Sequence, residues 1–131
     1  MSLYVLDVHS AIARERMKHH PSVWFSPFHA AECIHAIAQQ VFYGKVSPVE
    51  ADTVFDILKH DRASGLWLET EMPENTFDLC TELARRYGPK LGMRTLDSLH
   101  VACALELKAE RFWTFDERQS KLAKAAGLKI S

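Results

Sequence analysis

Two aspartates in the last third of the chain have the type and position expected of metal ligands. Asp97 lies in the first turn of an apolar helix predicted over Thr95–Leu107, and Asp116 directly follows the apolar run Phe112–Phe115. The carboxyl ends of strands in an α/β sheet are where ligands and metals collect. Two acids delivered there by different elements therefore suggest a site for a hard cation.

Carboxylates that lie side by side need a counter-charge. Two unit charges about 4 Å apart repel by about 4 kcal/mol at an effective dielectric near 20. A bound Mg²⁺ or Mn²⁺ removes this repulsion. Such ions prefer oxygen ligands and keep several waters, which suits hydrolysis of a phosphodiester by a metal-activated water.

Both acids also have a simpler explanation. Asp97 could be an ordinary first-turn acid that favours the start of its helix. Asp116 and Gln119 match a capping box, so the aspartate could only cap the helix that follows. For Asp116 the two roles are compatible, because a capping side chain at a strand end can also point an oxygen into a site.

A third candidate acid, Glu32, lies early in the helix that opens at Ser26-Pro27. On a helical wheel it falls away from the apolar stripe, on the side of Phe28 and His35, which also suits a solvated surface acid. Glu32 belongs to the predicted site only if that side borders the strand ends where the two aspartates meet.

Basic residues accompany the same segments. Arg94 flanks Asp97 and Arg118 follows Asp116, so a local patch could hold an RNA backbone. Charges of this kind are also common on solvated surfaces. The formal net charge of −1 favours neither reading, because only a local basic patch would be needed.

The chain has the length and composition of one ordinary globular domain, residues 1–131, with 47% apolar and 25% charged residues. Three scattered cysteines lack metal-ligand spacing and indicate a reduced, cytoplasmic protein. The apolar run Leu3–Leu6 is too short for a signal peptide or a membrane span.

Helices and short apolar strands alternate along the chain, which predicts an α/β fold with a parallel sheet covered on both faces. The expected helices are Asp7–His20, Pro27 to Gly44, Pro48 to Ser64, Pro73–Tyr87 ended by Gly88-Pro89, Thr95–Leu107 and Glu117–Ala126. The expected strands are Ser22–Phe25, Leu66–Thr70, Arg111–Phe115 and Leu128–Ile130.

These motifs together resemble the PIN-domain family, specifically its VapC-type toxin ribonucleases. The resemblance is carried by Thr95-Leu-Asp-Ser-Leu-His100, by Thr114-Phe-Asp116 and by Ser26-Pro-Phe-His-Ala-Ala-Glu32 with the helix after it. It implies a three-layer α/β/α fold and Mg²⁺-dependent (or Mn²⁺-dependent) endoribonuclease activity restrained by a small antitoxin protein. It also implies that Glu32, Asp97 and Asp116 are the metal-site carboxylates.

The chain departs from the family pattern at its start. The family begins with an apolar strand that ends in an aspartate, whereas Asp7 lies only 25 positions before Glu32. We expect this first strand to be missing, through a late start codon at Met1, truncation or gene decay. Alternatively, Leu3–Leu6 is a substitute strand with Asp7 at its end. Without a central strand, unpaired backbone groups would favour a homodimer.

Two functions from different classes follow. The first is a metal-dependent ribonuclease that uses Glu32, Asp97 and Asp116. The second is a non-catalytic PIN-like module that binds RNA or an antitoxin, since three acids could bind the ion too weakly. A third reading treats all three acids as helix caps in an unrelated α/β domain.

Overall fold

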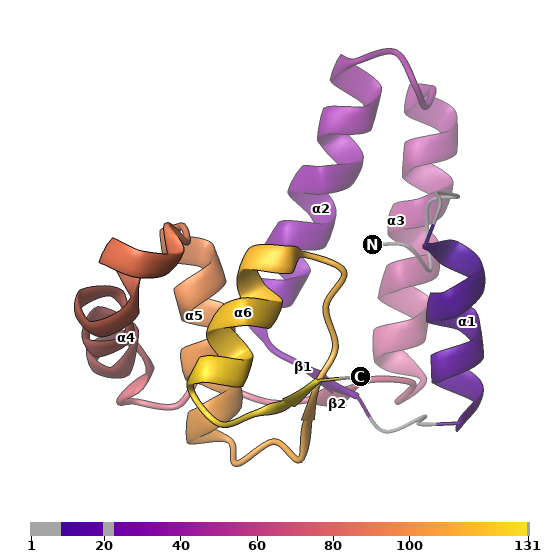
Figure 1. Cartoon of the computed structure of the whole chain (residues 1–131). Helices are drawn as coiled ribbons and strands as arrows, with labels where there is room; N and C mark the ends of the chain where they lie inside the picture. The colour runs from indigo at the N-terminus through magenta and orange to yellow at the C-terminus, as the bar shows by residue number, and fades with distance from the viewer. Residues whose placement is uncertain (1–8, 20–22, 131) are drawn as a thin grey trace. The chain divides into compact units, whose positions relative to one another are not determined.

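The computed structural model describes residues 9–19 and 23–130 (Figure 1). The chain divides into two compact units, Met1–Glu71 and Met72–Ser131. That both belong to one domain, 1–131, stays a prediction. No helix in the described part of the chain is long and apolar enough to cross a bilayer. The predicted strand Leu3–Leu6 and Asp7 lie outside the described residues.

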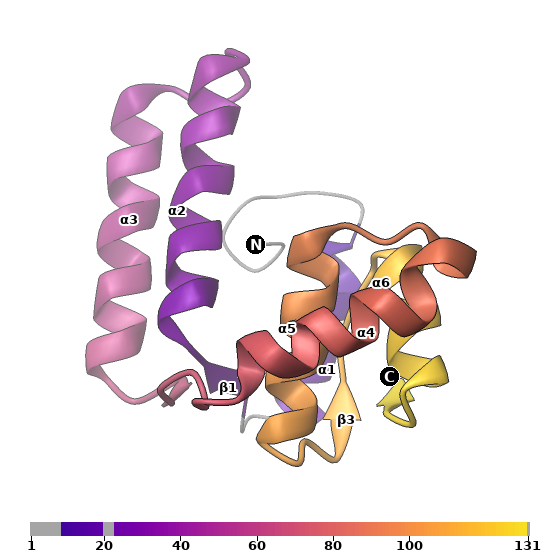
Figure 2. The same cartoon turned by 90° about the vertical axis from the view of Figure 1, so that its left-hand side faces the viewer.

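The first unit contains a pair of long helices that lie side by side, α2 and α3 (Figures 1 and 2). Both begin where the sequence predicts, at a serine followed by a proline. Ser26 caps α2, and Ser47 and Glu50 form the predicted capping box of α3. The elements of the unit are α1 (Ser10–His19), β1 (Trp24–Phe25), α2 (Pro27–Phe42), α3 (Pro48–Ala63) and β2 (Leu68–Glu69).

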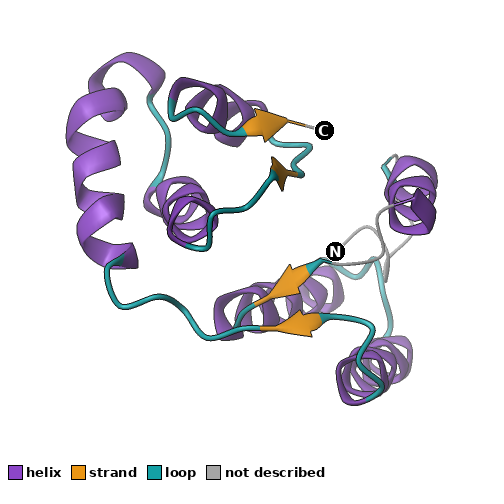
Figure 3. Ribbon diagram, turned by 90° about the horizontal axis from the view of Figure 1, so that it is seen from below, coloured by secondary structure: helices purple, strands orange, loops and turns teal. Residues whose placement is uncertain are grey.

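A small apolar cluster holds this unit together. Phe25, Leu58 and Trp67 are buried against one another, with the rings of Phe25 and Trp67 5.4 Å apart. β1 and β2 pair in parallel beside the cluster, with Phe25 opposite Glu69 (Figure 3). Arg62 lies over the Phe25 ring and donates to Glu69 at 2.7 Å. The cluster thus fixes the strand that leads into α2, the helix that carries Glu32.

The second unit contains α4 (Thr76–Leu91), α5 (Thr95–Glu106), β3 (Arg111–Phe112), α6 (Glu117–Ala125) and β4 (Lys129–Ile130). α5 packs against both α4 and α6 (Figure 2). It is buried on nearly all sides, since Leu99, Val101, Ala102 and Cys103 are each at most 7% exposed. α5 is therefore the central helix of this unit, as its apolar sequence predicts.

The predicted end of α4 at Gly88-Pro89 is wrong. The helix continues to Leu91 with Pro89 inside its last turn. A proline in that turn removes one backbone donor but leaves the remaining bonds of the helix in place. α4 ends instead at Gly92, which adopts a left-handed backbone (φ 61°) and donates its N–H to Gly88 O at 2.9 Å.

Parallel strands are present as predicted, but they are shorter than the apolar runs. β3 covers Arg111–Phe112 rather than Arg111–Phe115, and β3 and β4 pair in parallel. Phe115, placed by the sequence at the end of this strand, is 41% exposed and leads into α6. In the described residues the four strands form two pairs, β1–β2 in the first unit and β3–β4 in the second.

Candidate active site

Asp97 is held at the start of a buried helix. It is the third residue of α5 and is only 1% exposed. Its Oδ2 accepts the backbone N–H of Arg94 at 2.9 Å, the reach of a third-position acid back to the residue before the helix. The start of α5 also contacts α4, since the Cys80 Sγ lies 3.9 Å from Thr95 O. Local capping and apolar packing together fix the Asp97 carboxylate.

Asp116 caps the next helix, as the sequence predicts. Its Oδ1 accepts the backbone N–H groups of Arg118 and Gln119, at 2.8 and 3.2 Å, and so satisfies two donors at the start of α6. Its Oδ2 takes no part in this capping. Because the side chain is 36% exposed, the second oxygen remains accessible for another interaction.

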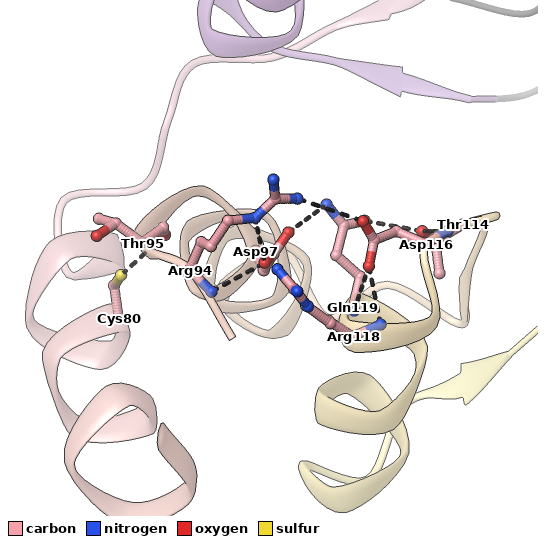
Figure 4. Close-up of polar contacts among 8 residues, drawn as sticks. All are labelled: Cys80, Arg94, Thr95, Asp97, Thr114, Asp116, Arg118 and Gln119. Carbon is pink, nitrogen blue, oxygen red and sulfur yellow. Dashed lines mark hydrogen bonds and ion pairs between the residues drawn. The ribbon is translucent and has the colours of Figure 1, made fainter. Parts of the chain in front are cut away.

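Arg94 connects the two carboxylates. Its Nε lies 3.3 Å from Asp97 Oδ2, and its Nη2 lies 3.4 Å from Asp116 Oδ2 (Figure 4). One guanidinium thus contacts acids that stand at the starts of two different helices. Asp97 and Asp116, which the sequence predicts to lie together, thus both contact Arg94, and their role as a metal site stays a prediction. The sequence predicted Arg94 only as an RNA contact, not as a bridge.

Gln119 and Thr114 form a support that the sequence did not predict. In a capping box the Gln119 side chain would reach back to the Asp116 N–H. Instead Thr114 Oγ1 accepts that N–H at 3.0 Å, and Gln119 donates through Nε2 to Asp97 Oδ1 at 3.3 Å. Thr114 Oγ1 also donates to Gln119 Oε1 at 2.8 Å, which orients the amide. The only signal in the sequence was a glutamine three residues after Asp116, which is typical of a simple cap.

The environment of Asp97 favours the ionised acid. Burial is the largest influence on its pKa and raises it, but hydrogen bonds from the Arg94 backbone, the Arg94 side chain and Gln119 together outweigh burial. The pKa of Asp97 therefore lies below its ordinary value. The carboxylate stays charged at neutral pH although almost none of it reaches solvent.

The cysteines do not provide a nucleophile of comparable quality. Burial raises the pKa of both the Cys80 and the Cys103 thiol, so the thiolate form is scarce at neutral pH. All three cysteines are free of disulfide bonds. Of the groups in the second unit, the two carboxylates and their arginine offer the clearest chemistry.

The roles of the other two predicted site residues, Glu32 and Arg118, stay predictions. Glu32 lies on α2 in the first unit and is partly exposed, so its convergence on the two aspartates stays a prediction. Arg118 is exposed in the first turn of α6, and its contact with RNA also stays a prediction. Within residues 9–19 and 23–130, no group of three or more His, Cys, Asp and Glu residues could hold a metal ion.

Comparison with known proteins gives the family. The family model of the PIN domain matches residues 3–125, nearly the whole chain. No curated protein and no solved structure matches this chain. PIN domains have a three-layer α/β/α fold, are generally nucleases and typically use divalent metal ions. The short parallel strands and abundant helices described above agree with that fold. On this match, the chain belongs to the PIN domain family.

Proposed function

We propose that the protein is a divalent-metal-dependent endoribonuclease of the VapC toxin type, with Mg²⁺ or Mn²⁺ as its ion. The observation that carries the proposal is the contact of Asp97 and Asp116 with one cationic group, the Arg94 guanidinium. Two carboxylates that share one cation in this way offer the oxygen ligands that Mg²⁺ prefers.

The donor set fits such an ion. Mg²⁺ is commonly bound through one or two carboxylates while it keeps several waters, so Asp97 and Asp116 are sufficient as primary ligands. Glu32 would be the third. When bound, the ion would polarise the phosphodiester and lower the pKa of the attacking water.

The surrounding residues have distinct tasks in this proposal. Gln119 holds the Asp97 carboxylate at a fixed angle, and the backbone N–H groups of α6 do the same for Asp116. Arg94 and Arg118 would bind the phosphates of RNA. The starts of α5 and α6 add the positive ends of two helix dipoles, which also favour a phosphate nearby.

RNA cleavage by the purified full chain tests the proposal. We expect cleavage of single-stranded or structured RNA with Mg²⁺, and none after chelation with EDTA. Asp97→Asn should reduce cleavage by more than about 100-fold, because even indirect partners of metal ligands contribute about 10–100-fold. Asp52→Asn, an exposed acid on α3, is the matched control. Metal-independent cleavage, or full activity of Asp97→Asn, would contradict the proposal.

Glu32 requires its own test, because only the resemblance assigns it to the site. We expect Glu32→Gln to reduce cleavage by at least about tenfold if it ligates the ion directly or through water. His35→Gln, one turn further along α2, controls for changes to the helix surface. Unchanged cleavage by Glu32→Gln would remove this residue from the site and leave the aspartate pair.

A second candidate function is a non-catalytic module that binds RNA or an antitoxin. The observation that favours it is that Arg94 already neutralises part of the charge of the two acids. Binding of Mn²⁺ and RNA without turnover would support it, and any metal-dependent cleavage would exclude it.

The proposed antitoxin follows from the family resemblance, the homodimer from the expected loss of a central strand, and the location from the cysteines. We propose a small antitoxin protein and a homodimer, in the cytoplasm, where the free thiols of the chain stay reduced. Sedimentation of the full chain tests the dimer. A monomer at all accessible concentrations would contradict it.

A further inference from the structure

We propose that Arg94 is a displaceable counter-ion of the metal site: its guanidinium bridges Asp97 and Asp116 when no divalent cation is bound, and it leaves both acids when one binds. The inference rests on the proposed function, because it takes the two aspartates as ligands of the cation.

The contacts of the Arg94 side chain are long for charged groups. Its Nε and Nη2 lie 3.3 and 3.4 Å from the two carboxylate oxygens, whereas charge-assisted bonds are usually about 2.7–2.9 Å. The Arg94 side chain is also 64% exposed, although Asp97 beneath it is buried. The contact with Asp116 is an exposed ion pair, and such pairs contribute little free energy. The contact with Asp97 is partly buried, but its length and the exposure of the guanidinium favour displacement there too.

The formal charges of the three groups favour the exchange. Arg94 supplies one positive charge against two carboxylates, so one negative charge of the trio stays uncompensated. A divalent cation supplies two positive charges at the same place. Such a cation is also a hard ion that prefers oxygen ligands, which the carboxylates supply.

The acids remain in place when the guanidinium leaves, because each is held by other donors. Asp97 keeps the backbone N–H of Arg94 at Oδ2 and the Gln119 amide at Oδ1. Asp116 keeps two backbone N–H groups at Oδ1. The bridge between the two acids depends on the Arg94 side chain. The ligands are thus positioned in advance for a cation that is not the arginine.

Calorimetric titration of the full chain with Mn²⁺ at constant ionic strength tests the exchange. Arg94→Gln removes both the charge and the bridge, and we expect Mn²⁺ to bind about tenfold more tightly. Arg94→Lys keeps the charge but loses the planar guanidinium that contacts two acids at once. We expect this variant to bind Mn²⁺ about threefold more tightly than the unaltered protein. Arg118→Gln, which removes a nearby charge without a bridge, should change affinity by less than about twofold.

The outcomes separate this inference from the proposed function. Loss of Mn²⁺ binding in Asp97→Asn supports the site itself. If that loss occurs but Arg94→Gln matches Arg118→Gln, or binds the ion less tightly than the unaltered protein, displacement is wrong and the site stands. If neither the unaltered protein nor Arg94→Gln binds Mn²⁺, both proposals fail. Binding that appears only in Arg94→Gln would show that Arg94 blocks the ion rather than giving way to it, and would contradict displacement.

A spectroscopic readout follows the side chain itself. The Nε–H signal of Arg94, assigned by its loss in Arg94→Lys, should shift as Mg²⁺ is added and end at the position of a solvent-exposed arginine. The Nε–H signal of Arg62, which is bonded to Glu69 on the first unit, is the internal control and should not move. An Arg94 signal that stays unchanged at saturating Mg²⁺ would overturn displacement.

Discussion

At the starts of α3 and α5 the acid at the third helical position accepts the N–H of the residue before the helix, and only one of these two acids lies in the candidate site. At the start of α3, Glu50 accepts the Ser47 N–H at 2.7 Å. At the start of α5, Asp97 accepts the Arg94 N–H at 2.9 Å. The local geometry is alike and the pKa of both acids lies below its ordinary value. The surroundings of the two acids differ.

Glu50 is exposed, and its bonds go to the neighbouring Ser47. Asp97 is buried and also accepts a hydrogen bond from Gln119, which is 22 residues away in the sequence. Through Arg94 it is connected to a second acid at the start of another helix. An acid in the first turn of a helix is thus a cap by default. An acid that is buried and also has a partner from another element is a candidate site residue.

The largest expected effect on stability comes from neutralising the buried acid. Asp97→Asn loses the charge that Arg94 and Gln119 surround, and we expect the free energy of unfolding to fall by about 1–3 kcal/mol at pH 7. Glu50→Gln is the matched change at the exposed cap and should stay within about 0.5 kcal/mol. Urea denaturation of both variants measures the difference. Equal losses of unfolding free energy in the two variants would contradict the distinction between the buried and the exposed acid.

Acid should remove the difference between Asp97→Asn and the unaltered protein. Because the folded-state pKa of Asp97 is lowered, its ionised form stabilises the fold at pH values above its unfolded pKa, about 3.9. That stabilisation is lost as the pH falls through the folded-state pKa. Denaturation curves between pH 7 and pH 3 should therefore converge. A constant gap across this range would show that the loss is one of packing rather than charge.

Removal of the distant partner should weaken the site without removing a ligand. Gln119→Leu keeps the size of the side chain but takes the donor from Asp97 Oδ1. We expect Mn²⁺ affinity to fall by about tenfold, the lower end of the range for such supporting residues. Lys124→Gln, an exposed change on the same helix, should leave Mn²⁺ affinity unaltered. A purely structural role of Gln119 would lower stability and leave the affinity unchanged.

The smallest effect separates the two roles of Asp116. Asp116→Asn keeps a side-chain oxygen for capping but loses the charge, whereas Asp116→Ala loses both. We expect Asp116→Ala to be about 1 kcal/mol less stable than Asp116→Asn, with Mn²⁺ binding reduced alike in both. Thermal unfolding and Mn²⁺ titration measure the two quantities. Intact Mn²⁺ binding in Asp116→Asn would reduce Asp116 to a cap.

The sequence predicts the parts of this architecture that depend on near neighbours. Ser26-Pro27 and Ser47-Pro48 begin helices because side-chain capping and a proline at the first position act locally. The end of α4 was missed, since Gly88-Pro89 resembles a stop but the left-handed turn falls at Gly92. The strand Arg111–Phe115 was overestimated, because an apolar run does not reveal where pairing with β4 ends.

The candidate site was predicted in part for the same reason. Asp97 and Asp116 were predicted to lie together by reasoning about where strands end and helices begin, and Asp116 was recognised as a cap. The bridge from Arg94 and the support from Gln119 join residues 22 positions apart. No local rule pairs such residues, because their contact depends on how α5 packs against α6. The place of Glu32 still rests on the family resemblance.

Counting Mn²⁺ ions bound to the full chain, by the loss of the free-ion signal in electron paramagnetic resonance, tests the central claim most directly. The account predicts a site that is present in the unaltered protein and in Glu50→Gln but lost in Asp97→Asn. Equal Mn²⁺ binding by all three proteins would contradict it.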